Sequence, residues 1–285
     1  MPGLGEGFGK LILVGEHAVV HGQPAIAFAV DLRTRVRLRR VDGDTVQIPG
    51  DDPRLHRALA AALPGGLSVE LDSEVPIGRG MGSSAALAVA AVRALADLEA
   101  RSLDNDELHA RAMLIEQVFH GNPSGLDVAI SSRGGVLAYR RGPPPTLEEL
   151  EPPTWSAVVL DSGSSGDTAD QVAGVAARRP GVDPTLEAIG ELVVQARSVL
   201  HDAHALGPLL TRNHALLRTL GVSTPELDDL VALALEAGAC GAKLSGAGGG
   251  GVVLALCAQP GRVVEAAERR GVSALVVRPA RSGDP

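Results

Sequence analysis

The segment that most constrains the fold of this chain runs from Pro76 to Ala86 and reads PIGRGMGSSAA. It follows an apolar run at Leu67–Leu71, which predicts a β-strand, and it precedes an alanine-rich run at Ser84–Arg101, which predicts a helix. A glycine-rich turn between a strand and a helix brings unpaired N–H groups to the start of that helix. Because this point also carries the positive end of the helix dipole, the segment predicts an anion-binding site.

The segment has two interpretations at this point. In the first, its glycines let the backbone approach a polyphosphate closely, and the hydroxyl of Ser83 or Ser84 ligates the accompanying Mg²⁺. In the second, it is an ordinary glycine-rich turn in which Ser83 caps the helix. It is not a Walker A loop, because no GK[ST] follows, and it lacks the last glycine of the dinucleotide-binding fingerprint.

A second glycine-rich segment, Lys243–Gly251, reads KLSGAGGGG and is interpreted as a loop before a buried strand at Val252–Leu256. Consecutive glycines cost conformational entropy on folding, which indicates that something must come close to the backbone there. The alternative is a flexible hairpin. Two glycine loops in one chain favour a shared anionic ligand. Lys10 and Lys243 are the two lysines of the chain, and each stands beside a glycine-rich segment.

Two carboxylates, Glu116 and Asp127, are joined by QVFHGNPSGL. The turn at Asn122–Gly125 ends the helix that carries Glu116, so the chain can return and bring both carboxylates to one pocket. One would then hold a metal and the other would take a proton. The alternatives are a solvated helix residue for Glu116 and a helix cap for Asp127.

The apolar run that follows Lys10 predicts a strand whose alternation puts Lys10 and Glu16 on the same side, with His17 just beyond. The alternative for Lys10 and Glu16 is a surface ion pair of little energetic consequence. Further along, Arg33–Arg40 alternates apolar residues with arginines and predicts a half-exposed strand.

The proline-rich stretch RRGPPPTLEELEPPT over residues 140–154 predicts a linker or a long surface loop. We therefore expect two domains, residues 1–150 and residues 151–285. Apolar runs and amphipathic stretches on both sides of this boundary predict an α+β fold in which each of the two domains has two layers.

Composition excludes several classes of protein. The 34 acidic and 26 basic residues give a net charge of −8, with a pI of about 5.5, so neither a nucleic acid nor an anionic membrane is expected as a partner. The apolar runs are far shorter than the roughly 20 residues that span a bilayer. No export signal is visible, and the 2 cysteines fit a reducing compartment, so a cytoplasmic location is expected.

Three segments taken together resemble, in order, the three sequence motifs of the kinases named for galactose, homoserine, mevalonate and phosphomevalonate, the GHMP kinases. They are GKLILVGEHAVVHGQPAIA, VPIGRGMGSSAALAVA and GAKLSGAGGGGVVLAL. Within this group the form GEHAVVHG and the segment GNPSGLDVAISSRGGVLAYRRG are most similar to the mevalonate kinases. The resemblance extends from residue 7 to about residue 256. It implies a ribosomal S5 domain 2-like N-terminal domain and a ferredoxin-like C-terminal domain.

The activity that the resemblance implies is the ATP-dependent phosphorylation of the 5-hydroxyl of (R)-mevalonate, with Mg²⁺ as cofactor. Asp127 would accept the proton of the hydroxyl, with Lys10 beside it, and Ser84 and Glu116 would ligate the metal. The resemblance also implies a possible homodimer. The alternatives are a phosphomevalonate or sugar kinase, and a silent small-molecule sensor, which would be expected to lack Lys10, Glu116 or Asp127.

The resemblance also implies binding residues. Glu16 and His17 would contact mevalonate. The residues that would bind the ATP phosphates are Pro76, Gly78, Gly80, Gly82, Ser83, Ser84, Ala85, Gly246 and Gly248. The chain departs from the family where it has Gly7-Phe8-Gly9-Lys10, where Met81 replaces leucine, and where Arg79 replaces a small residue. Arg79 either contacts a phosphate or points outward.

Overall fold

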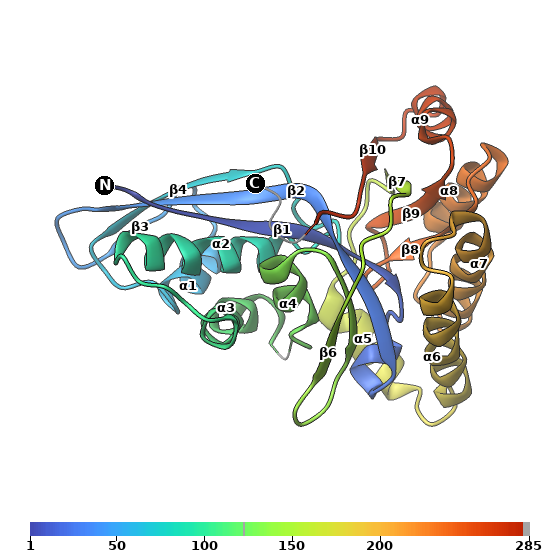
Figure 1. Ribbon diagram of the computed structural model, residues 1–285, viewed down its shortest axis with the longest axis horizontal. Coiled ribbons are helices and arrows are strands. Elements are labelled where there is room, and N and C mark those ends of the chain that lie inside the picture. Colours follow the sequence, from blue (N-terminus) through green and yellow to red (C-terminus); the bar gives the residue numbers. More distant parts are fainter. Residues whose placement is uncertain (122, 282–285) are drawn as a thin grey trace. The chain divides into compact units, whose positions relative to one another are not determined.

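The computed structural model describes residues 1–121 and 123–281 and forms two compact units that are interleaved along the chain (Figure 1). The first unit comprises residues 1–10, 31–77 and 82–134, and the second comprises residues 11–30, 78–81 and 135–285. Strands β1 (Gly3–Val14) and β2 (Pro24–Arg40) contribute to both units. No helix in the described residues is long and apolar enough to cross a membrane.

The first unit packs helices against antiparallel strands. In it, residues 34–40 of β2 pair with β4 (Leu67–Ser73), which also pairs in parallel with the short β3 (Val46–Gln47). Val36 and Leu38 of β2 are buried, and this confirms the predicted alternation. The helices of this unit are α1 (Pro53–Ala60), α2 (Ser83–Leu98), α3 (Asn105–His120) and α4 (Leu126–Arg133).

The start of β1 lies directly on α2. A Cβ atom at Gly3, Gly5 or Gly7 would collide with the backbone carbonyl of Ala94, Ala90 or Ala86, respectively. Two residues of a strand advance the chain about 6.6 Å and four residues of a helix advance it about 6 Å, so glycines spaced by two match alanines spaced by four. This spacing explains why the N-terminus reads GLGEG and why α2 is rich in alanine.

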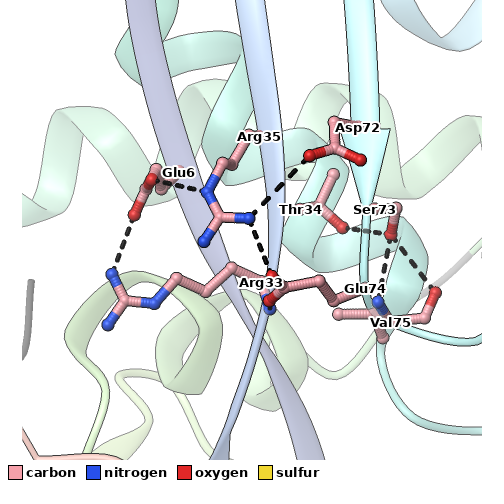
Figure 2. Close-up of polar contacts among 8 residues, drawn as sticks. All are labelled: Glu6, Arg33, Thr34, Arg35, Asp72, Ser73, Glu74 and Val75. Atoms are coloured by element: carbon pink, nitrogen blue, oxygen red, sulfur yellow. Dashed lines mark hydrogen bonds and ion pairs between the residues drawn. The ribbon is translucent and has the colours of Figure 1, made fainter.

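An ion-pair network lies on this sheet in the first unit (Figure 2). Arg33 binds Glu6 at 2.8 Å, and Arg35 lies between Glu6 and Glu74 at 2.9 Å from each. Hydrogen bonds from these arginines hold the pKa values of Glu6 and Glu74 below their usual range. Arg33 and Arg35 of β2 therefore pair with a carboxylate of β1 and with one that directly follows β4.

The second unit contains a four-stranded antiparallel sheet of β7 (Ser156–Asp161), β8 (Gly241–Ser245), β9 (Val252–Cys257) and β10 (Ala274–Val277), in the order β10-β7-β9-β8. This is the strand order of a ferredoxin-like βαββαβ arrangement, with helices between β7 and β8 and between β9 and β10. The other elements of this unit are η1 (Ala18–His21), β5 (Val136–Arg140), β6 (Thr146–Leu150), α5 (Thr168–Ala177), α6 (Asp183–Ser198), α7 (Ala203–Thr219), α8 (Pro225–Glu236) and α9 (Pro260–Arg269).

Two sequence interpretations need correction. The stretch expected to be a linker contains β6, which pairs antiparallel with β5, because the three consecutive prolines lie in the turn between the two strands. Lys243 and Ser245 lie in β8 rather than in a loop, since the buried Ala242 and Leu244 provide a strand core that the glycine content had obscured. The division into domains at residue 150 stays a prediction, because the units describe compactness and are not contiguous in sequence.

Candidate active site

Lys10 and Asp127 form an ion pair in the first unit. Lys10 Nζ lies 3.0 Å from Asp127 Oδ2, and the side chain of Lys10 is 5% exposed whereas that of Asp127 is 33% exposed. Asp127 lies in the first turn of α4, which Gly125 precedes with a φ of 85°. The alternative interpretation of Asp127 as a helix cap is therefore wrong. The pair combines a buried ammonium group with a carboxylate that solvent can reach.

Gly82 makes room for Lys10 at the start of α2. It precedes Ser83, the first residue of the helix, with a φ of 73°, and a Cβ atom there would lie 2.6 Å from Lys10 Cγ. Because Gly82 has no side chain, no side-chain cap occupies the first N–H groups of α2. Ser83 is thus not the cap of this helix, which corrects the alternative interpretation of the segment. The helix start is open to an anion.

Glu116 of α3 is buried with its side chain 1% exposed, and its Oε1 atom has no hydrogen-bond partner among the described residues. Burial raises its pKa to about 7, and the charge of Asp127 adds to this shift. A hydrogen bond with Ser84 and the charge of Lys10 act in the opposite direction. Glu116 is therefore not the solvated helix residue of the alternative interpretation. A buried carboxyl with a raised pKa beside other charged groups is typical of a functional site.

His120 is a residue of this cluster that the sequence analysis missed. Its Nε2 atom lies 3.0 Å from Ser84 Oγ and 3.9 Å from Glu116 Oε2. The spacing of Glu116 and His120, four residues apart on one helix, places both side chains on the same face and could have indicated this contact. The predicted turn at Asn122–Gly125 cannot be described completely, because Asn122 lies outside the described residues.

A second buried ion pair lies in the second unit. Glu16 contacts Lys243 Nζ through Oε1 and accepts a hydrogen bond of 3.0 Å from Asn213 Nδ2 through Oε2. Lys243 also donates to the carbonyl of Ile12 at 3.3 Å, and Glu16, Lys243 and Asn213 are all buried. The alternative interpretation of a surface pair between Lys10 and Glu16 is wrong, because both side chains are buried and each binds a different partner.

His17 adopts an unusual backbone conformation for a residue other than glycine, with a φ of 59°. Its Nε2 atom donates to the carbonyl of Ala247 at 2.8 Å, so Nδ1 of the neutral ring remains an acceptor. Burial lowers the pKa of His17 and favours this neutral form. His17 thereby contacts the loop Gly246–Gly251, which we call the second glycine loop.

The second glycine loop joins β8 to β9, so it is a hairpin connection, as the alternative interpretation had it. It also lies against residues Gly78–Met81, which we call the first glycine loop. A Cβ atom at Gly80 would lie 3.3 Å from the carbonyl oxygen of Ser245, and one at Gly251 would lie 3.5 Å from that of Arg79. The two glycine loops thus lie against each other within the second unit, and the shared anionic ligand expected from the sequence stays a prediction.

Comparison with known families identifies the group to which the chain belongs. The family model described as GHMP kinases N terminal domain matches residues 54–135, and the family model described as GHMP kinases C terminal matches residues 186–272. A protein from Pyrococcus horikoshii named mevalonate kinase is 36% identical over 96% of this chain and 94% of its own length. The chain belongs to the GHMP kinase family. The predicted family and α+β fold class are thereby confirmed.

Solved structures of GHMP kinases share this fold. The crystal structure of L. major mevalonate kinase in complex with R-mevalonate matches with a TM-score of 0.88 and 29% identity, over 98% of this chain and 97% of that one. The Streptococcus pneumoniae phosphomevalonate kinase matches with a TM-score of 0.80 and 19% identity, over 98% of this chain and 99% of that one. At that lower identity the likeness shows the fold alone, so the fold by itself does not select the substrate.

Proposed function

We propose that this GHMP kinase transfers the γ-phosphoryl group of ATP to the 5-hydroxyl of (R)-mevalonate. The observation that carries the proposal is 36% identity to a mevalonate kinase over 96% of the chain. Within the first unit, the Lys10–Asp127 pair and the buried Glu116 provide groups that such a reaction needs. The hydroxyl oxygen of the substrate bonds to the γ-phosphorus, the bond to the bridging oxygen breaks, and ADP leaves.

Asp127 would accept the proton that the hydroxyl loses. Its carboxylate is partly exposed, so an alcohol can reach it, whereas Lys10 is held beside it by the packing of its stem against Gly82. Lys10 would offset the negative charge that develops on the attacking oxygen. Because these groups act on charge that is largest in the transition state, their contribution belongs mainly to kcat.

Glu116 and Ser84 would hold Mg²⁺ bound to ATP. The unpartnered Oε1 atom of Glu116 and the hydroxyl of Ser84 are oxygen donors of the kind that Mg²⁺ prefers. Across residues 1–121 and 123–281, no group of three or more His, Cys, Asp or Glu side chains could hold a metal by itself. This fits an ion bound through one carboxylate and substrate phosphates. The metal would neutralise charge on the transferred phosphoryl group.

The remaining binding assignments are part of the same proposal. The open start of α2 supports an interaction of the ATP phosphates with the segment from Pro76 to Ala85. Gly246 and Gly248 of the second glycine loop would support those phosphates, and His17 would contact mevalonate through Nδ1, the acceptor of its neutral ring. Glu16 stays a predicted substrate contact, although both its carboxylate oxygens bind Lys243 and Asn213.

A substrate panel tests the proposal. ADP release is measured with Mg²⁺ and ATP in the presence of (R)-mevalonate, phosphomevalonate, homoserine or galactose. We expect turnover with (R)-mevalonate and at least a hundredfold lower kcat/KM with the others. Turnover of phosphomevalonate or a sugar in place of mevalonate would refute the substrate assignment, and binding of mevalonate without turnover would favour a sensor.

Two variants test the assignments of Asp127 and Lys10. We expect Asp127→Asn and Lys10→Met each to lower kcat by roughly two to four orders of magnitude, with much smaller changes in the dissociation constant of ATP. Because both side chains act on one hydroxyl, the double variant should lose far less than the product of the single losses. An Asp127→Asn enzyme that retains more than about a tenth of kcat would remove Asp127 from this role.

A further inference from the structure

Arg79 is the one charged residue between Glu74 and Arg93, in a segment of glycine, serine and apolar residues. Its guanidinium group does not extend freely into solvent. Arg79 Nε lies 3.0 Å from Asp161 Oδ2 at the end of β7, and Arg79 Nη1 donates to the carbonyl of Ser164 at 3.0 Å. All three residues belong to the second unit. The arginine thus ties the first glycine loop to the turn that follows β7.

The carbonyl of Ser164 is shared by a second donor. The N–H of Gly251 donates to it at 2.8 Å, and Ser162 Oγ donates to the carbonyl of Gly251 at 2.8 Å. Asp161 is fixed in turn by the N–H of Gly163, which donates to Oδ1 at 2.8 Å. We call this arrangement of Arg79, Asp161, Ser164 and Gly251 the three-loop junction, because it joins both glycine loops to the turn after β7.

The first glycine loop needs such an anchor. Gly78 and Gly80 have φ values of 72° and 74°, which lie in the left-handed region. Because glycine adopts many other conformations as easily, these residues do not by themselves hold the loop in one shape. Fixing each such residue in one conformation costs conformational entropy. Met81 is buried and anchors the C-terminal end of the loop. Arg79 is the side chain that fixes its middle.

We propose that Arg79 is a positioning residue that holds the first glycine loop in its phosphate-binding shape through Asp161 and Ser164, without itself contacting the phosphates. This inference rests on the proposed ATP-dependent function. Two of the three guanidinium nitrogens already have partners, and a direct contact with phosphate would have to compete with Asp161. A loop that is already ordered binds its ligand more tightly because less entropy is lost on binding.

The test compares equilibrium binding of Mg·ATP, measured by calorimetry without an alcohol substrate, in Arg79→Ala, Asp161→Asn and the double variant. We expect each single variant to weaken ATP binding roughly five- to tenfold, and the double variant to be no weaker than the weaker single variant. KM for ATP should rise by the same factor with kcat changed less than about threefold. Arg197→Ala, which removes an exposed arginine that binds Glu148 on the same unit, is the matched control and should leave binding unchanged.

A direct role for Arg79 predicts a different pattern. If the guanidinium contacts phosphate, then Asp161→Asn releases it and removes a negative charge, so ATP binding should be unchanged or tighter, and Arg79→Lys should restore most of the affinity. The positioning role predicts little restoration by lysine, which cannot reach both acceptors in the geometry of a guanidinium group. Unchanged binding in both single variants, or a wild-type chain that binds no Mg·ATP, would also overturn the proposal.

The proposed substrate can fail separately. If the wild-type chain binds Mg·ATP but does not phosphorylate mevalonate, the function is wrong, and the binding comparison still decides the role of Arg79. Thermal unfolding without nucleotide separates misfolding from positioning. Arg79 and Asp161 are 28% and 26% exposed, so we expect unfolding temperatures close to that of the wild type. The isosteric Asp161→Asn variant keeps the comparison decisive if Arg79→Ala unfolds.

Discussion

Glu116→Gln should make the free protein more stable at neutral pH while it lowers activity. Burial raises the pKa of Glu116 from 4.5 to about 7, so ionisation of this carboxyl destabilises the folded state. Between these two pH values the folded state binds more protons than the unfolded state, and the free energy of unfolding therefore falls as pH rises. The neutral amide of glutamine removes this cost.

The magnitude follows from the shift. The change in pKa from 4.5 to about 7 corresponds to about 3 kcal/mol, of which about 2.5 kcal/mol develops between pH 5 and pH 8. The advantage of Glu116→Gln over the wild type should thus grow by about 2.5 kcal/mol over that interval. A constant cost of burying the amide affects both pH values equally and cancels from the comparison.

Urea unfolding followed by circular dichroism at pH 5 and pH 8 measures this difference. Circular dichroism follows the helices of both units, whereas the single tryptophan, Trp155, belongs to the second unit and Glu116 to the first. Glu107→Gln in the same helix, where the side chain is 35% exposed and binds arginines, is the matched control and should show no such growth. Addition of Mg·ATP should stabilise the wild type more than Glu116→Gln. A difference that stays constant with pH, or decreases toward pH 8, would refute the reasoning.

Three further predictions concern packing and charge. Gly82→Ala should lower kcat at least tenfold in a steady-state assay, because the added methyl group would displace the stem of Lys10 and the residue would be strained at a φ of 73°. A wild-type kcat would contradict this prediction. Asn213→Ala should lower the free energy of unfolding by about 1–3 kcal/mol in urea titrations, because Glu16 Oε2 would be left buried without its donor. A loss of less than about 0.5 kcal/mol would contradict this prediction. Arg35→Ala should cost no more than about 1 kcal/mol, and the loss should shrink in 1 M salt; a salt-independent loss would argue against an ionic contribution.

The elements with a strong local pattern could be predicted from the sequence. The alternation of Arg33–Arg40, the alanine-rich helix after the first glycine loop and the cap of α3 are determined by neighbouring residues alone. Asp104, for example, accepts a hydrogen bond from the N–H of Glu107 at 2.8 Å, which is the local contact that an aspartate makes when it caps a helix. Such features need no knowledge of the rest of the fold.

The features that could not be predicted depend on partners distant in sequence. Nothing near Glu16 indicates that Lys243 and Asn213 will bind its carboxylate, and nothing near Arg79 indicates Asp161. The hairpin of β5 and β6 was missed because its prolines suggested a break in structure. Those prolines are compatible with a hairpin, since they occupy the turn and leave the ladder donors of both strands intact.

The two lysines show how a compositional bias can point to a site. Apart from Lys10 and Lys243, all the Lys and Arg positions of the chain are arginine. We infer that an arginine would fit poorly at these two positions. Lys10 has its stem against Gly82, and Lys243 is fully buried between Glu16 and the carbonyl of Ile12. An ammonium group needs less space and can turn its protons toward partners at different angles, whereas a guanidinium group requires a planar set of acceptors. Each lysine binds a carboxylate, Lys10 that of Asp127 and Lys243 that of Glu16. Lys10 thus lies beside the carboxylate that we propose as the base, and Lys243 neutralises a buried carboxylate that Asn213 also binds.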